Sequence, residues 1–138
     1  MEPYALDLAI PSDVQYIEGI VAQIAARCAA FDFPAQTVTL KLPVALTEAL
    51  SNAILRGNKE QHGKVVRVRA RVDDEALVIE VADEGGGFDL DRCTRDPTTP
   101  DRIEREDGRG LFLMQQLVDR VEQYVDGGNV VRLTVRRM

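Results

Sequence analysis

Two stretches of alternating residues, 65–72 and 76–83, constrain the fold more than any other feature of the sequence. In the first, VVRVRARV, arginine and aliphatic side chains alternate with a period of two, so they lie on opposite faces of a β-strand. The short polar segment DDE at 73–75 joins the two predicted strands. One face of the resulting sheet is apolar and must be covered by other elements, whereas the opposite face carries charge.

The charged face carries Arg67, Arg69 and Arg71, and two interpretations of these arginines remain open. The first is an outer sheet face in contact with water, and the second is a docking surface for an acidic partner. The formal net charge of −6 argues against direct binding of nucleic acid, because such a protein has to neutralise phosphates.

Hydrophobic periodicity and turn residues predict the other elements. These are a strand over 4–11, helices over about 13–30, 43–56 and 109–122, and a closing hairpin over 121–138 that turns at 127–129. Ser12, with Gln15 three residues later, resembles the capping box of the first helix, and Pro43 suits the first turn of the second. Phe112 and Met114 of the third helix are expected in the core.

This order of elements predicts the fold class. A strand, two helices, two strands, a helix and two strands indicate an α/β (α+β) two-layer sandwich with a mixed, mostly antiparallel sheet and helices on one face. We expect a single domain over 1–138. The sequence shows no signal-peptide pattern and no membrane-spanning run, and Cys28 and Cys93 form no disulfide framework or metal-ligand spacing. A cytoplasmic protein is the prediction.

Two groups of residues are candidates for chemistry. Glu48 and Asn52 are four residues apart on the second helix and therefore share one face, although a surface glutamate and a locally bonded asparagine would give the same pattern. Five of the ten glycines lie between 85 and 110, at the two ends of a charged segment, 89–107, that contains no hydrophobic period. Backbone without a Cβ atom can approach a flat base closely and direct N–H groups toward an anion.

Taken together, these residues form three ordered boxes. Glu48-x-x-x-Asn52, then Asp83-x-Gly85-x-Gly87-Phe88, then Gly108-x-Gly110-Leu111 resemble the signature of the GHKL ATPases, whose domain has the Bergerat-type fold. The superfamily includes histidine kinases, chaperone and mismatch-repair ATPases, and anti-sigma serine kinases of the RsbW and SpoIIAB type. The resemblance extends over nearly the whole chain.

The resemblance implies a role for each residue of the boxes. Asn52 would bind Mg²⁺ and Asp83 would accept a hydrogen bond from the exocyclic amine of adenine. Backbone at four glycines would hold the nucleotide: Gly85 and Gly87 beside the base, and Gly108 and Gly110 at the phosphates. The segment 89–107 would act as a mobile lid over ATP. Arg105, within that lid, would either reach the γ-phosphate or remain a solvated charge.

The residue four positions before Asn52 separates the branches of the superfamily. Histidine kinases tend to carry asparagine there, whereas Glu48 can accept a proton from a serine hydroxyl, as in the anti-sigma serine kinases. That branch implies an ATP-dependent serine kinase acting on an anti-anti-sigma (STAS-type) protein, with a sigma factor as a further partner. The alternative is a nucleotide-gated binding module without useful phosphotransfer. Arg56 departs from the branch, which often has histidine there, and the edge strand 4–11 offers a homodimer surface.

Overall fold

The fold is built on a five-stranded sheet with the order β1-β2-β3-β5-β4. The structure is a computed structural model that describes residues 2–61, 63–85, 110 and 112–138. Its strands are β1 (Tyr4–Pro11), β2 (Val65–Val72), β3 (Ala76–Ala82), β4 (Arg120–Val125) and β5 (Asn129–Arg136). Every neighbouring pair is antiparallel, so the expected mixed sheet is wholly antiparallel among the described strands.

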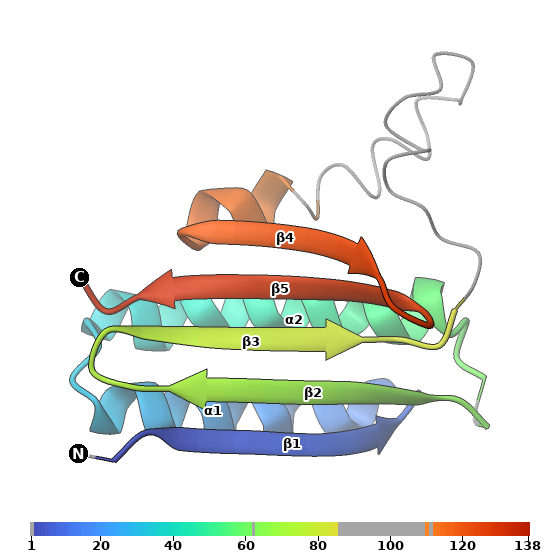
Figure 1. Ribbon diagram of the computed structural model, residues 1–138, viewed down its shortest axis with the longest axis horizontal. Helices are drawn as coiled ribbons and strands as arrows, with labels where there is room; N and C mark the ends of the chain where they lie inside the picture. Colours follow the sequence, from blue (N-terminus) through green and yellow to red (C-terminus); the bar gives the residue numbers. More distant parts are fainter. Residues whose placement is uncertain (1, 62, 86–109, 111) are drawn as a thin grey trace.

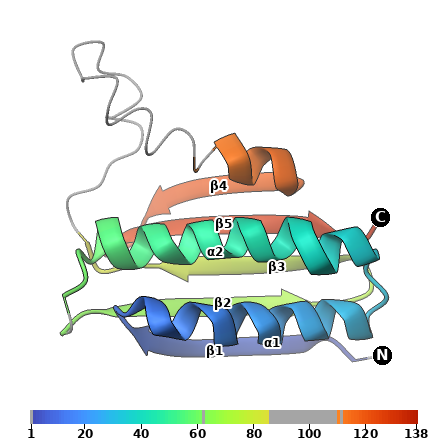
Figure 2. The same cartoon turned by 180° about the vertical axis from the view of Figure 1, so that it is seen from behind.

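Two helices cover one face of this sheet, as the sequence predicted. α1 (Ile17–Ala30) lies behind β1 and β2 in Figure 1, and α2 (Leu42–Asn52) lies behind β3 and β5. Figure 2, from the opposite side, shows both helices in front of the strands. The largest fully buried side chains come from these helices and from the facing side of β2, β3 and β5, so the core lies between the two layers.

The alternation in β2 sets which face is buried. Val66, Val68 and Val72 are fully buried, while the arginines between them are exposed, so the predicted two faces are confirmed. A shift of one residue in the pairing of β2 would exchange the two sets, which fixes the register strongly. β2 pairs with β1 along its length, with Val65 opposite Pro11 and Val72 opposite Tyr4.

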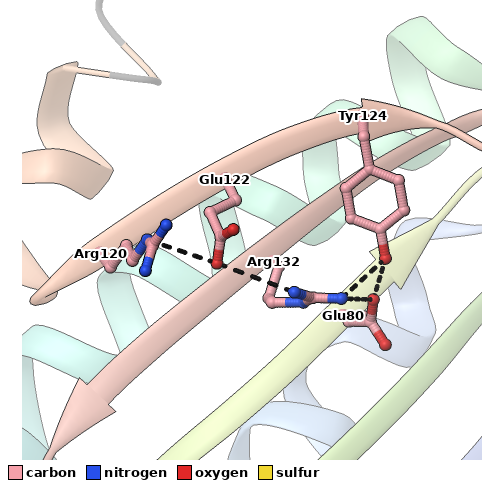
Figure 3. Close-up of polar contacts among 5 residues, drawn as sticks. All are labelled: Glu80, Arg120, Glu122, Tyr124 and Arg132. Carbon is pink, nitrogen blue, oxygen red and sulfur yellow. Dashed lines mark hydrogen bonds and ion pairs between the residues drawn. The ribbon is translucent and has the colours of Figure 1, made fainter.

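The uncovered face carries ion pairs that run across several strands. Arg132 of β5 contacts Glu80 of β3 at 3.0 Å and Glu122 of β4 at 3.8 Å, and Tyr124 donates a hydrogen bond to Glu80 (Figure 3). On the β1 side of the face, Arg67 pairs with Asp7 of β1 at 2.9 Å. These charges largely compensate one another, which favours the solvated-face interpretation of the arginines in β2.

The second helical region is longer than predicted. The chain is helical from residue 35, and α2 is flanked by the π-helical turns Thr37–Lys41 and Ala53–Gly57. Pro43 therefore lies in the first turn of α2 and not at the start of the helical region as a whole. Proline has no backbone N–H and cannot donate a hydrogen bond to the preceding turn. A π-helical turn just before the proline is one of the ways in which a helix accommodates the missing bond.

Among the described residues, one helix, Thr37–Gly57, is long and apolar enough by length and composition to cross a membrane. Its central side chains Leu42, Leu46, Leu50 and Ile54 are fully buried in the core. Packing against the sheet therefore accounts for its apolar character.

Three sequence-based details were wrong. The turn before α1 is capped by Asp13, whose carboxylate accepts the Gln15 N–H, whereas Ser12 is buried and donates to Lys64 O. The third helix ends at residue 117 and not at 122, because the chain joins β4 from Arg120 onward. Phe112 is 62% exposed, although Met114 does lie in the core as expected.

Candidate functional site

The first part of the candidate site lies on α2. Glu48 and Asn52 are partly exposed, while Leu46 and Leu50 of the same helix are fully buried. The two polar residues therefore share the face that the core does not use, as their spacing predicted. Arg56, one turn further on in the π-helical turn, is also partly exposed.

Gly110 lies directly against this polar face. A Cβ atom at Gly110 would be 2.5 Å from Glu48 Oε1 and 3.2 Å from Asn52 Nδ2. Both distances are shorter than ordinary contacts, so the absence of a side chain is what allows the backbone to come this close. The structure thus brings together residues from the first and third sequence boxes, which are about sixty positions apart in the chain.

The second part of the site is the turn that follows β3. The Asp83 carboxylate accepts hydrogen bonds from two backbone N–H groups through Oδ1: Gly85 N at 2.8 Å and Asn129 N at 3.2 Å. The backbone N–H of Asp83 in turn donates to Asn129 O at 2.9 Å. The carboxylate is therefore held in place by its own turn and by the start of β5, and these bonds involve only one of its two oxygens.

Burial raises the pKa of Asp83, and the hydrogen bonds from Asn129 and Gly85 oppose that rise. The side chain of Asn129 also lowers this pKa, yet its buried Nδ2 has no hydrogen-bond partner among the described residues. A half-buried carboxylate beside an unpaired amide is a polar arrangement that a ligand with its own donors and acceptors would complete.

Three glycines pack closely against the Asp83 turn. A Cβ atom at Gly57 would overlap the Asp83 carboxylate, one at Gly85 would overlap Gly57 O, and one at Gly128 would overlap Asp83 O. The end of α2, the end of β3 and the β4–β5 turn meet at the same end of the sheet (Figure 1). Backbone from three separate segments therefore forms the surroundings of one carboxylate.

Several predicted site residues lie outside the described residues. These are Gly87, Arg105 and Gly108, together with Gly86, Phe88, Leu111 and the whole segment 89–107. Their roles remain predictions. Of the predicted set, the structure places Glu48, Asn52 and Gly110 in one group, and Asp83 and Gly85 in another.

The donor set fits Mg²⁺ and a nucleotide. Asn52 offers an amide oxygen on a partly exposed surface next to the Glu48 carboxylate, and Mg²⁺ prefers oxygen ligands that it shares with phosphates. Within the described parts of the chain, no group of three or more His, Cys, Asp and Glu side chains could hold a metal by itself. Asp83 offers a partly buried carboxylate that can accept a hydrogen bond from a base.

Sequence reasoning missed four residues of this region: Gly57, Asn58, Gly128 and Asn129. The first two were interpreted only as the end of a helix, and the other two only as a hairpin turn. Both interpretations are correct locally, since α2 and its π-helical turn end at Gly57 and β5 begins at Asn129. No local pattern signals that they also surround Asp83, because that contact depends on how the strands pair.

Comparison with known proteins identifies the family of the chain. The family described as histidine kinase-like ATPase domain matches residues 10–135. The chain is 30% identical to the serine-protein kinase RsbW of Bacillus subtilis and 31% identical to that of Bacillus pumilus, over 94% of this chain and 83% of each relative. It is also 26% identical to an anti-sigma F factor of Clostridium beijerinckii, over 67% of this chain and 66% of that protein. The chain therefore belongs to the histidine kinase-like ATPase domain family, within the GHKL superfamily that its three sequence boxes resemble.

Proposed function

We propose that this protein is a cytoplasmic, ATP-dependent serine kinase of a partner-switching module. Its substrate is a STAS-type anti-anti-sigma protein, and it also acts as an anti-sigma factor by holding a sigma factor inactive. The names of its relatives, serine-protein kinase and anti-sigma F factor, support both parts of the proposal. The observation that carries the kinase part is the close packing of Gly110 against Glu48 and Asn52.

The proposed reaction uses Glu48 as general base. Its carboxylate accepts the proton of a serine hydroxyl on the partner protein, and the serine oxygen forms a bond to the γ-phosphorus of ATP. The bond between that phosphorus and the bridging β–γ oxygen breaks, and ADP leaves with the electron pair. Phosphoserine and ADP are the products, and the proton stays on Glu48 until solvent removes it.

The other residues bind and orient the nucleotide. Asp83 accepts a hydrogen bond from the exocyclic amine of adenine, and backbone at Gly85 lies beside the base. Gly110 lies beside α2, where its backbone contacts the phosphates, and Gly87 and Gly108 are further predicted contacts. Asn52 would hold Mg²⁺, which when bound neutralises charge on the phosphate oxygens.

The experiment separates the two residues of α2. Glu48→Gln keeps the size of the side chain but removes the proton acceptor, so transfer from labelled ATP to the cognate partner should fall by about 10²–10⁴-fold with little change in ATP affinity. Asn52→Ala should weaken both Mg-ATP binding and transfer. Glu75→Gln, the same substitution at an exposed glutamate in the β2–β3 turn, is the matched control and should behave as wild type.

The outcomes distinguish the proposal from a nucleotide-gated binding module. Such a module would exchange partners on addition of ATP without labelling them, and Glu48→Gln would leave that exchange intact. Transfer at the wild-type rate in Glu48→Gln would remove Glu48 from the mechanism. Absence of any effect of Mg-ATP on the melting temperature of the intact protein would contradict the nucleotide site itself.

A further inference from the structure

A buried polar network lies directly behind the Asp83 turn. Its centre is Asn58, the residue after the π-helical turn that ends α2, which is fully buried. The Asn58 side-chain Nδ2 donates to Ser12 Oγ and to Val65 O, both at 2.9 Å. Ser12 Oγ then donates to Lys64 O at 2.7 Å. The network therefore joins the ends of β1 and α2 to the start of β2.

The remaining polar atom of this side chain faces the candidate site. Asn58 Oδ1 accepts the backbone N–H of Glu84 at 2.7 Å. Glu84 lies between Asp83 and Gly85, whose N–H binds the Asp83 carboxylate. The Asn58 amide thus holds the central peptide of the turn that orients the adenine-binding carboxylate.

A second contact fixes the same turn from outside. The Glu84 carboxylate accepts the backbone N–H of Val65, the residue whose carbonyl oxygen is bound by Asn58. The Glu84 peptide is therefore held to β2 through two routes, one buried and one exposed. Only the buried route is protected from competition by water, so the Asn58 amide is the stronger restraint on the position of the turn.

Ending a helix does not require this arrangement. A buried amide is costly unless its donors and acceptor are all satisfied, and here the three bonds point in three different directions. All three hydrogen bonds of the Asn58 amide can therefore form together only when the end of β3 occupies one position relative to α2 and β2. This is what a residue that sets the geometry of a site has to achieve.

We propose that Asn58 is a positioning residue for base recognition, which acts through the Glu84 peptide on the Asp83 carboxylate. The inference rests on the proposed function, because it assumes that Asp83 binds the exocyclic amine of adenine. Asn58 is fully buried, so its effect on the nucleotide is indirect. Its removal lets the turn relax, so the carboxylate loses its alignment with the base while the phosphate contacts at α2 persist.

The test compares two nucleotides that differ at the recognised group. ADP carries the exocyclic amine, whereas IDP has a carbonyl oxygen at that position, which cannot donate a hydrogen bond. Calorimetric titration with Mg²⁺ present should give the wild-type protein a preference for ADP over IDP of about 10-fold or more, as expected for a hydrogen bond to a charged group. In Asn58→Ala the preference should fall to about 3-fold or less, mainly through weaker binding of ADP.

A purely structural role would not change this ratio. The control is Val72→Ala, a core truncation at the opposite end of β2 from Val65, which lowers stability without touching the site. It should retain the wild-type preference. If Asn58→Ala does not fold, Asn58→Ser is the second variant, because it keeps a small polar group at this buried position but removes the amide oxygen that accepts the Glu84 N–H.

Each outcome has one meaning. Wild-type preference for ADP that survives in Asn58→Ala, or in Asn58→Ser, overturns the positioning role and leaves the proposed function standing. Wild-type protein that binds ADP and IDP equally overturns base recognition by Asp83, and the inference with it. Wild-type protein that binds neither nucleotide contradicts the proposed function itself. A preference lost in the Asn58 variants and kept in Val72→Ala supports the inference.

Discussion

Substitution of Gly110 by alanine should reduce phosphotransfer strongly while leaving the fold intact. The new Cβ atom would be 2.5 Å from Glu48 Oε1, so the carboxylate has to retreat by about 1 Å to reach an ordinary contact. A displacement of this size at a catalytic group costs about 10²-fold in rate, which corresponds to about 2.7 kcal/mol of barrier. The free energy of unfolding should change little, because alanine favours a helix by up to about 1 kcal/mol over glycine. The two nearest atoms, Glu48 Oε1 and Asn52 Nδ2, are also at the ends of side chains, which can move.

The assay is transfer of labelled phosphate to the cognate partner at saturating partner concentration, together with thermal unfolding. Gly19→Ala is the matched control for the gain of a Cβ in a helix, since a Cβ there would meet nothing within 4 Å beyond the backbone of its own helix. In a Glu48→Gln background, Gly110→Ala should cause little further loss, because both substitutions act on the same carboxylate. Transfer by Gly110→Ala at the wild-type rate, or a full additional loss in the Glu48→Gln background, would refute the reasoning.

Three further predictions follow from the pKa shifts. Burial raises the pKa of Asp83 in the folded protein. The protonated carboxyl therefore contributes stability that is fully present below the unfolded pKa of about 3.9 and is lost as pH rises through the pKa of the folded protein. Asp83→Asn should therefore gain stability relative to wild type between about pH 3 and pH 7 in urea unfolding, and a constant difference would contradict this. Burial raises the pKa of the Cys28 thiol to about 12, so iodoacetamide at pH 8 should leave Cys28 unlabelled in peptide mapping until the protein unfolds; rapid labelling in the folded protein would show the thiol to be accessible. The Tyr124 hydrogen bond and the Arg132 guanidinium lower the pKa of Glu80, so Tyr124→Phe should raise it in an NMR titration of the carboxyl carbon, and an unchanged value would exclude that hydrogen bond.

The fold was predictable because its determinants are local. Alternation in 65–72 fixed both the strand and its buried face, and Gly57 with Asn58 marked the end of the second helix. Helix boundaries were predicted less accurately, because strand pairing competes with helix formation. Residues 120–122 continue a helical pattern, yet they pair with β5 and complete the sheet.

The candidate site was predictable in part, for a related reason. Glu48 and Asn52 were identified by their spacing on one helix, and Asp83 by its place at the end of a predicted strand, just before the first glycine group. Asn58 and Asn129 contribute through contacts with residues 26 and 46 positions away, respectively. Nothing in their immediate sequence shows those contacts, because they arise from the order in which the strands are arranged.

The strand order has a consequence for synthesis of the protein. β5 follows β4 in the chain but lies between β3 and β4 in the sheet, and its first residue, Asn129, bonds to Asp83. A nascent chain whose β5 is still in the ribosome has no strand that can join β4 to β3. The carboxylate at the end of β3 then lacks one of its two backbone donors. Capacity to retain nucleotide should therefore arise abruptly with release of β5, and not gradually as the helices emerge.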